Sequence, residues 1–168
     1  MKNKGFSLVE LIIVIAIMAI LAAAIAPALI RYIDKSRRSD DVAAGETINT
    51  ATQAALANEE AYDEVQKAIP TSGSPVALAT AKADGNTPFT ILSGATGVSG
   101  SGTTFLEEIN SSCGGNAPKI KFTKGWGTNK PEYWTVVANA AGKPVVWLGT
   151  GSGTTNWMVQ PDICASYK

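Results

Sequence analysis

Residues 4–30 read KGFSLVELIIVIAIMAILAAAIAPALI, and the last twenty of them, residues 11–30, carry no charge and no strong hydrogen-bonding side chain. Twenty apolar residues form a helix of about 30 Å, which matches the hydrocarbon core of a bilayer. A helix buried in a soluble domain is seldom apolar on every face over this length. A cleaved secretory signal would end in a small-residue site, for which residues 22–24 or 26–28 would serve. The length of the run favours a transmembrane segment over both alternatives.

An acidic residue, Glu10, stands at the entrance of this apolar run. Signal peptides normally carry only positive charge at that point. The eleven Leu, Ile and Val residues of the run favour insertion by about 3 to 7 kcal/mol in sum, whereas one charge opposes it by at most about 3 kcal/mol. We therefore expect the segment to insert despite Glu10, which makes this carboxylate a candidate functional residue.

The apolar run continues into a polar segment, residues 31–58, that contains no proline. Small or apolar residues recur in it at helical spacing and predict one inward-facing side: Ala44, Ile48, Ala51 and Ala55. The pattern predicts an amphipathic helix that extends the anchor to a combined length of about 80 Å at 1.5 Å per residue. A shorter helix is expected over residues 59–69, ended by Pro70.

Residues 70–118 are rich in Gly, Ser, Thr and Pro and predict a long loop. Two short helices are expected inside it, one opening at Ser74 and Pro75 and one at Thr104, where Glu107 would complete a capping box. Four apolar or β-branched runs follow and each predicts a strand: residues 119–124, 132–138, 144–148 and 156–160. Their short connections favour an antiparallel meander. A long helix followed by a sheet of about four strands makes the fold class α+β.

Composition lowers the expectation of an enzyme. The 168-residue chain contains no histidine, which is the commonest general base and metal ligand. Its 14 Lys and Arg residues balance its 14 Asp and Glu residues, so no general affinity for nucleic acid is indicated. No catalytic residue, cofactor or metal ligand is predicted.

The two cysteines, Cys113 and Cys164, lie too far apart in the sequence for a CxxC metal or redox motif. If the domain lies outside the cytoplasm, a disulfide between them would close a loop of about 50 residues and stabilise the fold by roughly 4 kcal/mol on the chain-entropy model. Two free buried thiols are the alternative.

The N-terminal residues resemble those of type IV prepilins and of the related pseudopilins of type II secretion. The similarity consists of the short basic leader MKNKG, a glycine before an aromatic residue, a glutamate four residues later, and an apolar run with a late proline. In this chain the four single positions are Gly5, Phe6, Glu10 and Pro27. The resemblance covers the first third of the chain and implies a pilin-like fold.

This resemblance implies processing and assembly roles. A membrane prepilin peptidase would cleave between Gly5 and Phe6 on the cytoplasmic side and methylate the new amine of Phe6; glycine leaves room for the peptidase to approach the backbone. Glu10 would pair with the N-terminal amine of a neighbouring subunit and set the register between their helices. Pro27 removes one helical hydrogen bond, so we expect a kink or local unwinding near residues 23–26.

Five segments are expected along the chain. They are a cleaved leader (1–5), a transmembrane and assembly helix (6–30), an amphipathic helix (31–69), a variable loop (70–118), and the sheet with a C-terminal loop (119–168). Charge does not fix the membrane orientation, because four basic residues follow the apolar run and only two precede it. The resemblance implies that the C-terminus lies outside.

The resemblance implies a structural subunit that is stored in the cytoplasmic membrane and then polymerised into an extracellular type IV pilus, for adhesion, motility or DNA uptake. Its partners would be further copies of the chain, the prepilin peptidase, the assembly platform with its ATPase, and the bilayer before assembly. No specific contact with nucleic acid is evident. A pseudopilin of a type II secretion or competence system is an alternative. A single-pass membrane-anchored enzyme or binding domain is another, but the chain lacks histidine and any nucleophile motif.

Overall fold

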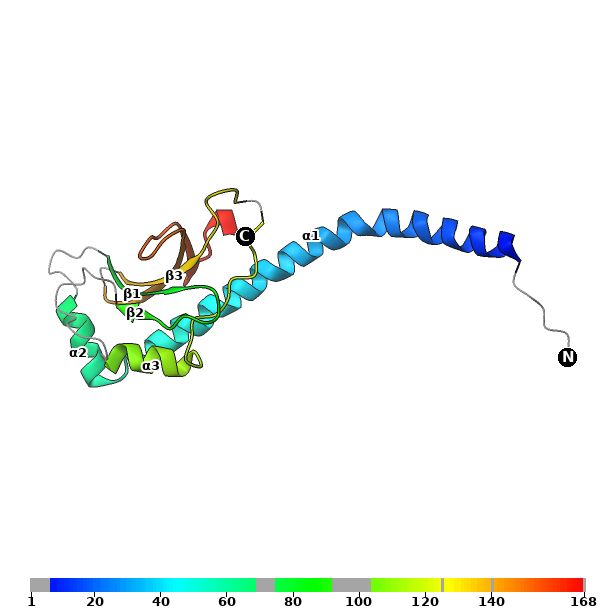
Figure 1. Cartoon of the computed structure of the whole chain (residues 1–168). Coiled ribbons are helices and arrows are strands. Elements are labelled where there is room, and N and C mark those ends of the chain that lie inside the picture. Colours follow the sequence, from blue (N-terminus) through cyan, green and yellow to red (C-terminus); the bar gives the residue numbers. More distant parts are fainter. Residues whose placement is uncertain (1–6, 69–74, 92–103, 125, 140, 168) are drawn as a thin grey trace, which may run out of the picture. The chain divides into compact units, whose positions relative to one another are not determined.

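The computed structural model describes residues 7–68, 75–91, 104–124, 126–139 and 141–167. These residues divide between two units, Met1–Ser36 and Arg37–Lys168. The described part of the first unit is helical from Leu8 onward, whereas the second unit contains the sheet and the shorter helices (Figure 1). Each unit is considered by itself below.

Helix α1 (Leu8–Ala55) contains 48 residues and passes through both units. It confirms that the apolar segment and the amphipathic segment after it are helical. Pro27 lies inside the helix without interrupting it, so the unwinding expected near residues 23–26 is not present. Three of the four residues predicted for the inward side are buried, and the fourth, Ala44, is half-buried.

Five antiparallel strands form one sheet in the order β2-β1-β3-β4-β5. Their bounds are Val76–Lys82 (β1), Thr90–Ile91 (β2), Tyr133–Ala138 (β3), Pro144–Gly149 (β4) and Trp157–Gln160 (β5). The last three strands confirm the predicted runs to within one residue at each end. The α+β class is therefore confirmed, with five strands instead of about four.

Strand β1 replaces the helix that the sequence predicted to open at Ser74 and Pro75. It pairs along its length with β3, from Val76 opposite Ala138 to Lys82 opposite Tyr133. The strand is rich in alanine, which favours helix in isolation, but pairing with a buried neighbour outweighs that weak preference.

Residues 119–124 do not join the sheet, although a strand was predicted there. Burial alternates along the segment, with Ile120 and Phe122 inside, so the amphipathic pattern itself is present. The backbone amides bind other partners. The Ile120 N–H donates to the Ala83 carbonyl at 3.1 Å, and the amides of Lys121 and Phe122 donate to the Asp41 carboxylate at 2.7 and 2.9 Å. The Asp41 carboxylate on α1 thus accepts hydrogen bonds that the backbone of a neighbouring strand would accept in a sheet.

Asp41 is only 1% exposed and accepts three hydrogen bonds. The third comes from the hydroxyl of Tyr167, in the C-terminal 3-10 helix η1 (Ala165–Tyr167), at 2.7 Å. Because a buried carboxylate is unfavourable unless it is hydrogen-bonded, these donors have to converge on it. One side chain therefore joins α1, the 119–124 segment and the end of the chain.

One turn after Asp41, the absence of a side chain at Gly45 lets α1 lie close to the sheet. A Cβ atom there would approach Val159 Cγ1 of β5 to 2.8 Å and Trp134 of β3 to 3.6 Å. Val159 and Trp134 are both buried on the sheet side of the core and have no long flexible end that could move aside. The glycine therefore sets the closest approach between helix and sheet in the second unit.

The two short helices predicted at residues 59–69 and from Thr104 onward are present as α2 (Glu59–Ala68) and α3 (Thr104–Ser112). The start of α3 is not capped by Glu107 as expected. The amides of Thr104 and Phe105 instead donate to the Glu64 carboxylate of α2, at 3.2 and 3.1 Å. The first amides of a helix lack intrahelical partners, so Glu64 caps α3 and fastens it to α2.

Cys113 and Cys164 are free thiols in the structure, which does not contain the disulfide expected between them. The reason lies in the strand order. Helix α3, which Cys113 follows directly, is held near β2 by two hydrogen bonds between Asn110 and the backbone of Phe89. The Cys164 N–H donates to Met158 of β5, at the opposite edge of the sheet. The hydrogen bonds thus tie the two cysteines to opposite edges of the sheet.

Replacing Asp41 by Asn would turn an NH₂ group toward backbone donors. We expect Asp41→Asn to lower the free energy of unfolding by about 3 kcal/mol or more, the range for disrupting a buried charged network. Chemical denaturation in detergent, followed by tryptophan fluorescence, measures the change. Asp40→Asn is the matched control, because Asp40 forms only an exposed ion pair with Lys121 at 3.1 Å, and its loss should change stability by less than about 1 kcal/mol. Equal effects in the two variants would contradict the role given to Asp41.

The Asp41 network also predicts a sensitivity to alkaline pH. Burial, together with the hydrogen bond to Asp41, raises the pKa of Tyr167 above its ordinary value of 10.0. The folded chain therefore prefers the neutral phenol, whose contribution to stability is complete below about pH 10 and is lost as the pH rises further. We expect the denaturation midpoint to fall between about pH 10 and 11, and to fall less in Tyr167→Phe, which cannot ionise there. Tyr62→Phe, at an exposed position, should keep the wild-type slope; the same slope in Tyr167→Phe would refute the assignment.

Candidate functional site

In the first unit, the apolar part of α1 is left uncovered by the residues that the structure describes. Every large apolar side chain from Leu8 to Ile33 is exposed, by 73% at the first and 42% at the last. The helix contains an 18-residue window with a mean hydropathy of 3.0, and none of that window is buried. By length and composition it is long and apolar enough to cross a membrane. A continuous apolar surface of this extent marks contact with lipid or with another protein.

The start of α1 is organised by Ser7 and Glu10. The Ser7 N–H donates to Glu10 Oε2 at 2.9 Å, and the Leu11 N–H donates to the Ser7 carbonyl at 3.2 Å. Ser7 therefore occupies the N-cap position and Glu10 the third helical position, which is one half of a capping box. The spacing Ser-x-x-Glu before an apolar run is the signal for this role, and the sequence reasoning overlooked it.

The structure places the predicted site residues separately. Glu10 lies in the first turn of α1 and Pro27 lies inside the same helix, about 26 Å further along its axis at 1.5 Å per residue. Gly5 and Phe6 lie outside the described residues. Joint action of Glu10 and Pro27 therefore has to involve more than one copy of the chain or the membrane.

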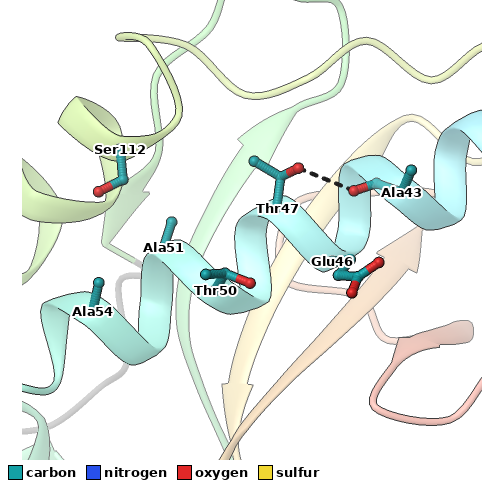
Figure 2. Close-up of a pocket in the computed structure, with 7 residues that line it drawn as sticks. All are labelled: Ala43, Glu46, Thr47, Thr50, Ala51, Ala54 and Ser112. Atoms are coloured by element: carbon teal, nitrogen blue, oxygen red, sulfur yellow. Dashed lines mark hydrogen bonds between the residues drawn. The ribbon is translucent and has the colours of Figure 1, made fainter.

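An open groove of about 530 Å³ follows the outer face of α1 in the second unit (Figure 2). Small side chains dominate its lining, which consists of Ala43, Glu46, Thr47, Thr50, Ala51, Ala54 and, across from them on α3, Ser112. The Thr47 hydroxyl is occupied by a hydrogen bond to the Ala43 carbonyl at 3.0 Å. Among the described residues that line the groove, Glu46 is the one ionisable group, so this lining pairs no nucleophile with a base.

A second hollow, of about 260 Å³, lies where β1 ends, beside residues 119–132. Lys82, Lys119 and Lys130 line it, together with Asp84 and Glu132. The Asn86 N–H donates to Asp84 at 2.8 Å and is the main reason why the pKa of this carboxyl lies below its ordinary value. Glu132 pairs with Lys130 at 3.0 Å. The hollow therefore has one more ammonium group than carboxylates, and Lys82 and Lys119 form no ion pair with another described residue.

Metal binding has no evident centre in this part of the molecule. Across residues 7–68, 75–91, 104–124, 126–139 and 141–167, no group of three or more His, Cys, Asp or Glu side chains is placed to hold an ion. Apart from the cap residue Ser7, the residues that the sequence reasoning missed are structural ones: Asp41, Glu64 and Asn110. Each is a polar residue whose partners lie far away in the sequence, so no local pattern indicated it.

Comparison with known proteins locates the similarity at the N-terminus. Residues 1–26 match the family described as the prokaryotic N-terminal methylation motif. The chain is 54% identical over 57 residues to the type IV major alpha-pilin of Moraxella bovis. That match covers 32% of this chain and 34% of the relative, about a third of each. No solved structure matches the chain.

The matched residues include the apolar part of α1 and the Ser7–Glu10 cap, which are the features that distinguish the first unit. The long helix followed by an antiparallel sheet is a pilin-like α+β architecture. Residues 1–26 carry the prokaryotic N-terminal methylation motif, and about a third of the chain is similar to a type IV major pilin.

Proposed function

We propose that this chain is a structural subunit of a type IV pilus and not an enzyme. Residues 11–30 of α1 would hold it in the cytoplasmic membrane, with the C-terminus outside, until assembly. The observation that carries the proposal is the apolar surface of α1, exposed from Leu8 to Ile33. Such a surface is unfavourable in water, so lipid has to cover it first and helices of other copies afterwards. The residues needed for storage and for polymerisation are then the same.

Processing would come before assembly. Cleavage between Gly5 and Phe6 by a prepilin peptidase would remove the basic leader and leave the amine of Phe6, which is then methylated. Ser7 follows Phe6 directly, so the cap that it forms with Glu10 would remain after cleavage. The mature helix would therefore begin with a positive amine close to a carboxylate that is already oriented.

Glu10 would select the register between helices. Its carboxylate is the one acidic group in the first turn of α1 and precedes a long apolar surface. At about 4 Å, attraction to a neighbour's amine amounts to roughly 4 kcal/mol at an effective dielectric of 20, before desolvation is subtracted. The pairing would therefore contribute more to alignment than to net stability.

Pro27 would be the weak point of the assembled helix. Proline has no N–H, so the carbonyl of Ala23 has no amide donor from this position. The helix is continuous there in the isolated chain. We place any stretching or local melting of α1 in the filament at residues 23–27, where one hydrogen bond is already missing.

A surface pilus is favoured over a secretion pseudopilus as the destination. The relative from Moraxella bovis is a type IV major pilin, and the methylation motif at residues 1–26 includes the start of α1. Assembly would require further copies of the chain and an ATP-driven platform that extracts α1 from the bilayer. A single-pass enzyme or binding domain would not require an apolar helix that also serves as a polymerisation surface.

Two substitutions of Glu10 separate its charge from its capping role. Glu10→Ala removes both, whereas Glu10→Gln removes the charge and keeps an acceptor for the Ser7 N–H, because glutamine also serves in capping boxes. We expect both variants to insert and to be cleaved normally but to yield at least about tenfold fewer filaments, which corresponds to about 1.4 kcal/mol. Electron microscopy and quantification of sheared filaments measure the yield.

N-terminal mass spectrometry of the membrane fraction is the control for cleavage and methylation at Phe6. Normal filament numbers from Glu10→Gln, with few from Glu10→Ala, would assign Glu10 to helix capping and remove the charge-pairing role. A wild-type chain that keeps its leader and forms no filaments would refute the proposed function as a whole.

A further inference from the structure

Charged side chains in the second unit separate into a basic end and an acidic end. The basic end comprises residues 37–41 of α1, the end of β1 and the segment 119–132. The acidic end comprises α2 and α3. This separation is hidden in the composition, because the whole chain is neutral.

At the basic end, five exposed lysines are held close to the entry of α1: Lys82, Lys119, Lys121, Lys124 and Lys130. The bonds from the amides of Lys121 and Phe122 to Asp41 fix segment 119–124 against α1. Three of the lysines share the 260 Å³ hollow. With Arg37 and Arg38, seven cationic side chains stand here against four carboxylates, those of Asp40, Asp41, Asp84 and Glu132.

The carboxylates of the basic end are engaged inside the chain. Asp41 is buried, Asp40 pairs with Lys121, and Glu132 pairs with Lys130. Lys119 and Lys124 form no ion pair with another described residue. The excess positive charge is therefore presented outward.

The acidic end carries six carboxylates against a single lysine, Lys67. Four belong to α2 and two to α3, namely Glu59, Glu60, Asp63, Glu64, Glu107 and Glu108. Figure 1 shows the two helices side by side, and the Glu64 cap on α3 holds them together. All except Glu64 are exposed.

The two ends lie at opposite ends of the part of α1 that packs on the sheet. From Asp41, which anchors the basic end, to Ala55, where α1 stops before α2, the helix advances about 21 Å at 1.5 Å per residue. This exceeds the Debye length of about 8 Å at physiological salt. Salt therefore screens most of the attraction between the two ends of one chain, and both ends are available to other molecules.

We propose that the basic end of one copy docks on the acidic α2–α3 end of the next copy in the filament. The inference rests on the proposed function, since it needs copies arranged in a regular stack. Each copy carries both a basic end and an acidic end. The partner that complements both ends is therefore a second copy of this chain. Each exposed ion pair alone contributes little, but several acting together favour one orientation and one register.

A charge-swap series tests this docking. The basic-end variant carries Lys119→Glu and Lys124→Glu, and the acidic-end variant carries Asp63→Lys and Glu108→Lys; all four positions are exposed, and the capping Glu64 is left intact. We expect each double variant to lower filament yield at least tenfold at physiological salt. The combination of all four substitutions should restore the yield to within about threefold of wild type, because both surfaces are then inverted and complementary again.

The control is Lys143→Glu, which reverses the charge of one exposed lysine between β3 and β4, outside both the basic and the acidic end. It should assemble normally. Circular dichroism and the membrane-bound amount of each variant verify folding and storage.

Normal assembly of both double variants, or no recovery in the combined variant, would overturn the proposal. A defect confined to the basic-end variant, with less protein retained in vesicles of anionic lipid, would also overturn it and would assign the basic end to lipid headgroups. If the wild type makes no filaments, the proposed function fails first. If it makes them and the swaps have no effect, only the docking fails.

Discussion

Burial of the Asp41 carboxylate is the constraint on which the second unit is built. A charge with 1% exposure is tolerated only if donors surround it, and here they come from the segment 119–124 and from Tyr167 near the C-terminus. These pieces, about 80 and 126 residues further along the chain, are therefore brought to one turn of α1. Gly45 one turn later then allows the sheet to approach the helix closely. Asp41 thus sets where the segment 119–124 and the C-terminus lie along α1, and Gly45, one turn later, sets how close the sheet lies to the helix.

Helix α1 meets two opposite requirements along its length. Before Ile33 its apolar side chains are large and exposed, which suits a surface that exchanges lipid for other helices. After Asp41 its inward side chains are small, and Ile48, Ala51 and Ala55 are covered by the chain itself. The first part keeps its apolar surface exposed, as the proposed assembly would require, and the second part is covered by the chain's own residues.

Sequence reasoning succeeded where the signal was local and failed where the partner was distant. Local patterns gave α1, α2 and the last three strands, and a capping signal gave α3 although Glu64 and not Glu107 caps it. The same reasoning misassigned β1, because pairing with β3 outweighs the helix preference of alanine. It also misassigned residues 119–124, whose alternating burial resembles that of a strand although their amides bind a helix side chain. The pairing of Cys113 and Cys164 was likewise beyond sequence reasoning, since the spacing of two cysteines does not report which sheet edges they occupy.

The sequence by itself determined the membrane-length helix, the N-terminal motif with Glu10 and the α+β order of elements, because each depends on neighbouring residues and on the period of a single element. Only the tertiary structure decided which polar residues are buried, which edges hold the cysteines, and that the charges of a neutral chain gather at two ends about 21 Å apart along α1. These properties arise from contacts between residues far apart in the chain. The free energy of each such contact depends on the residues that surround it after folding. Those residues are scattered along the sequence, so no local pattern indicates them.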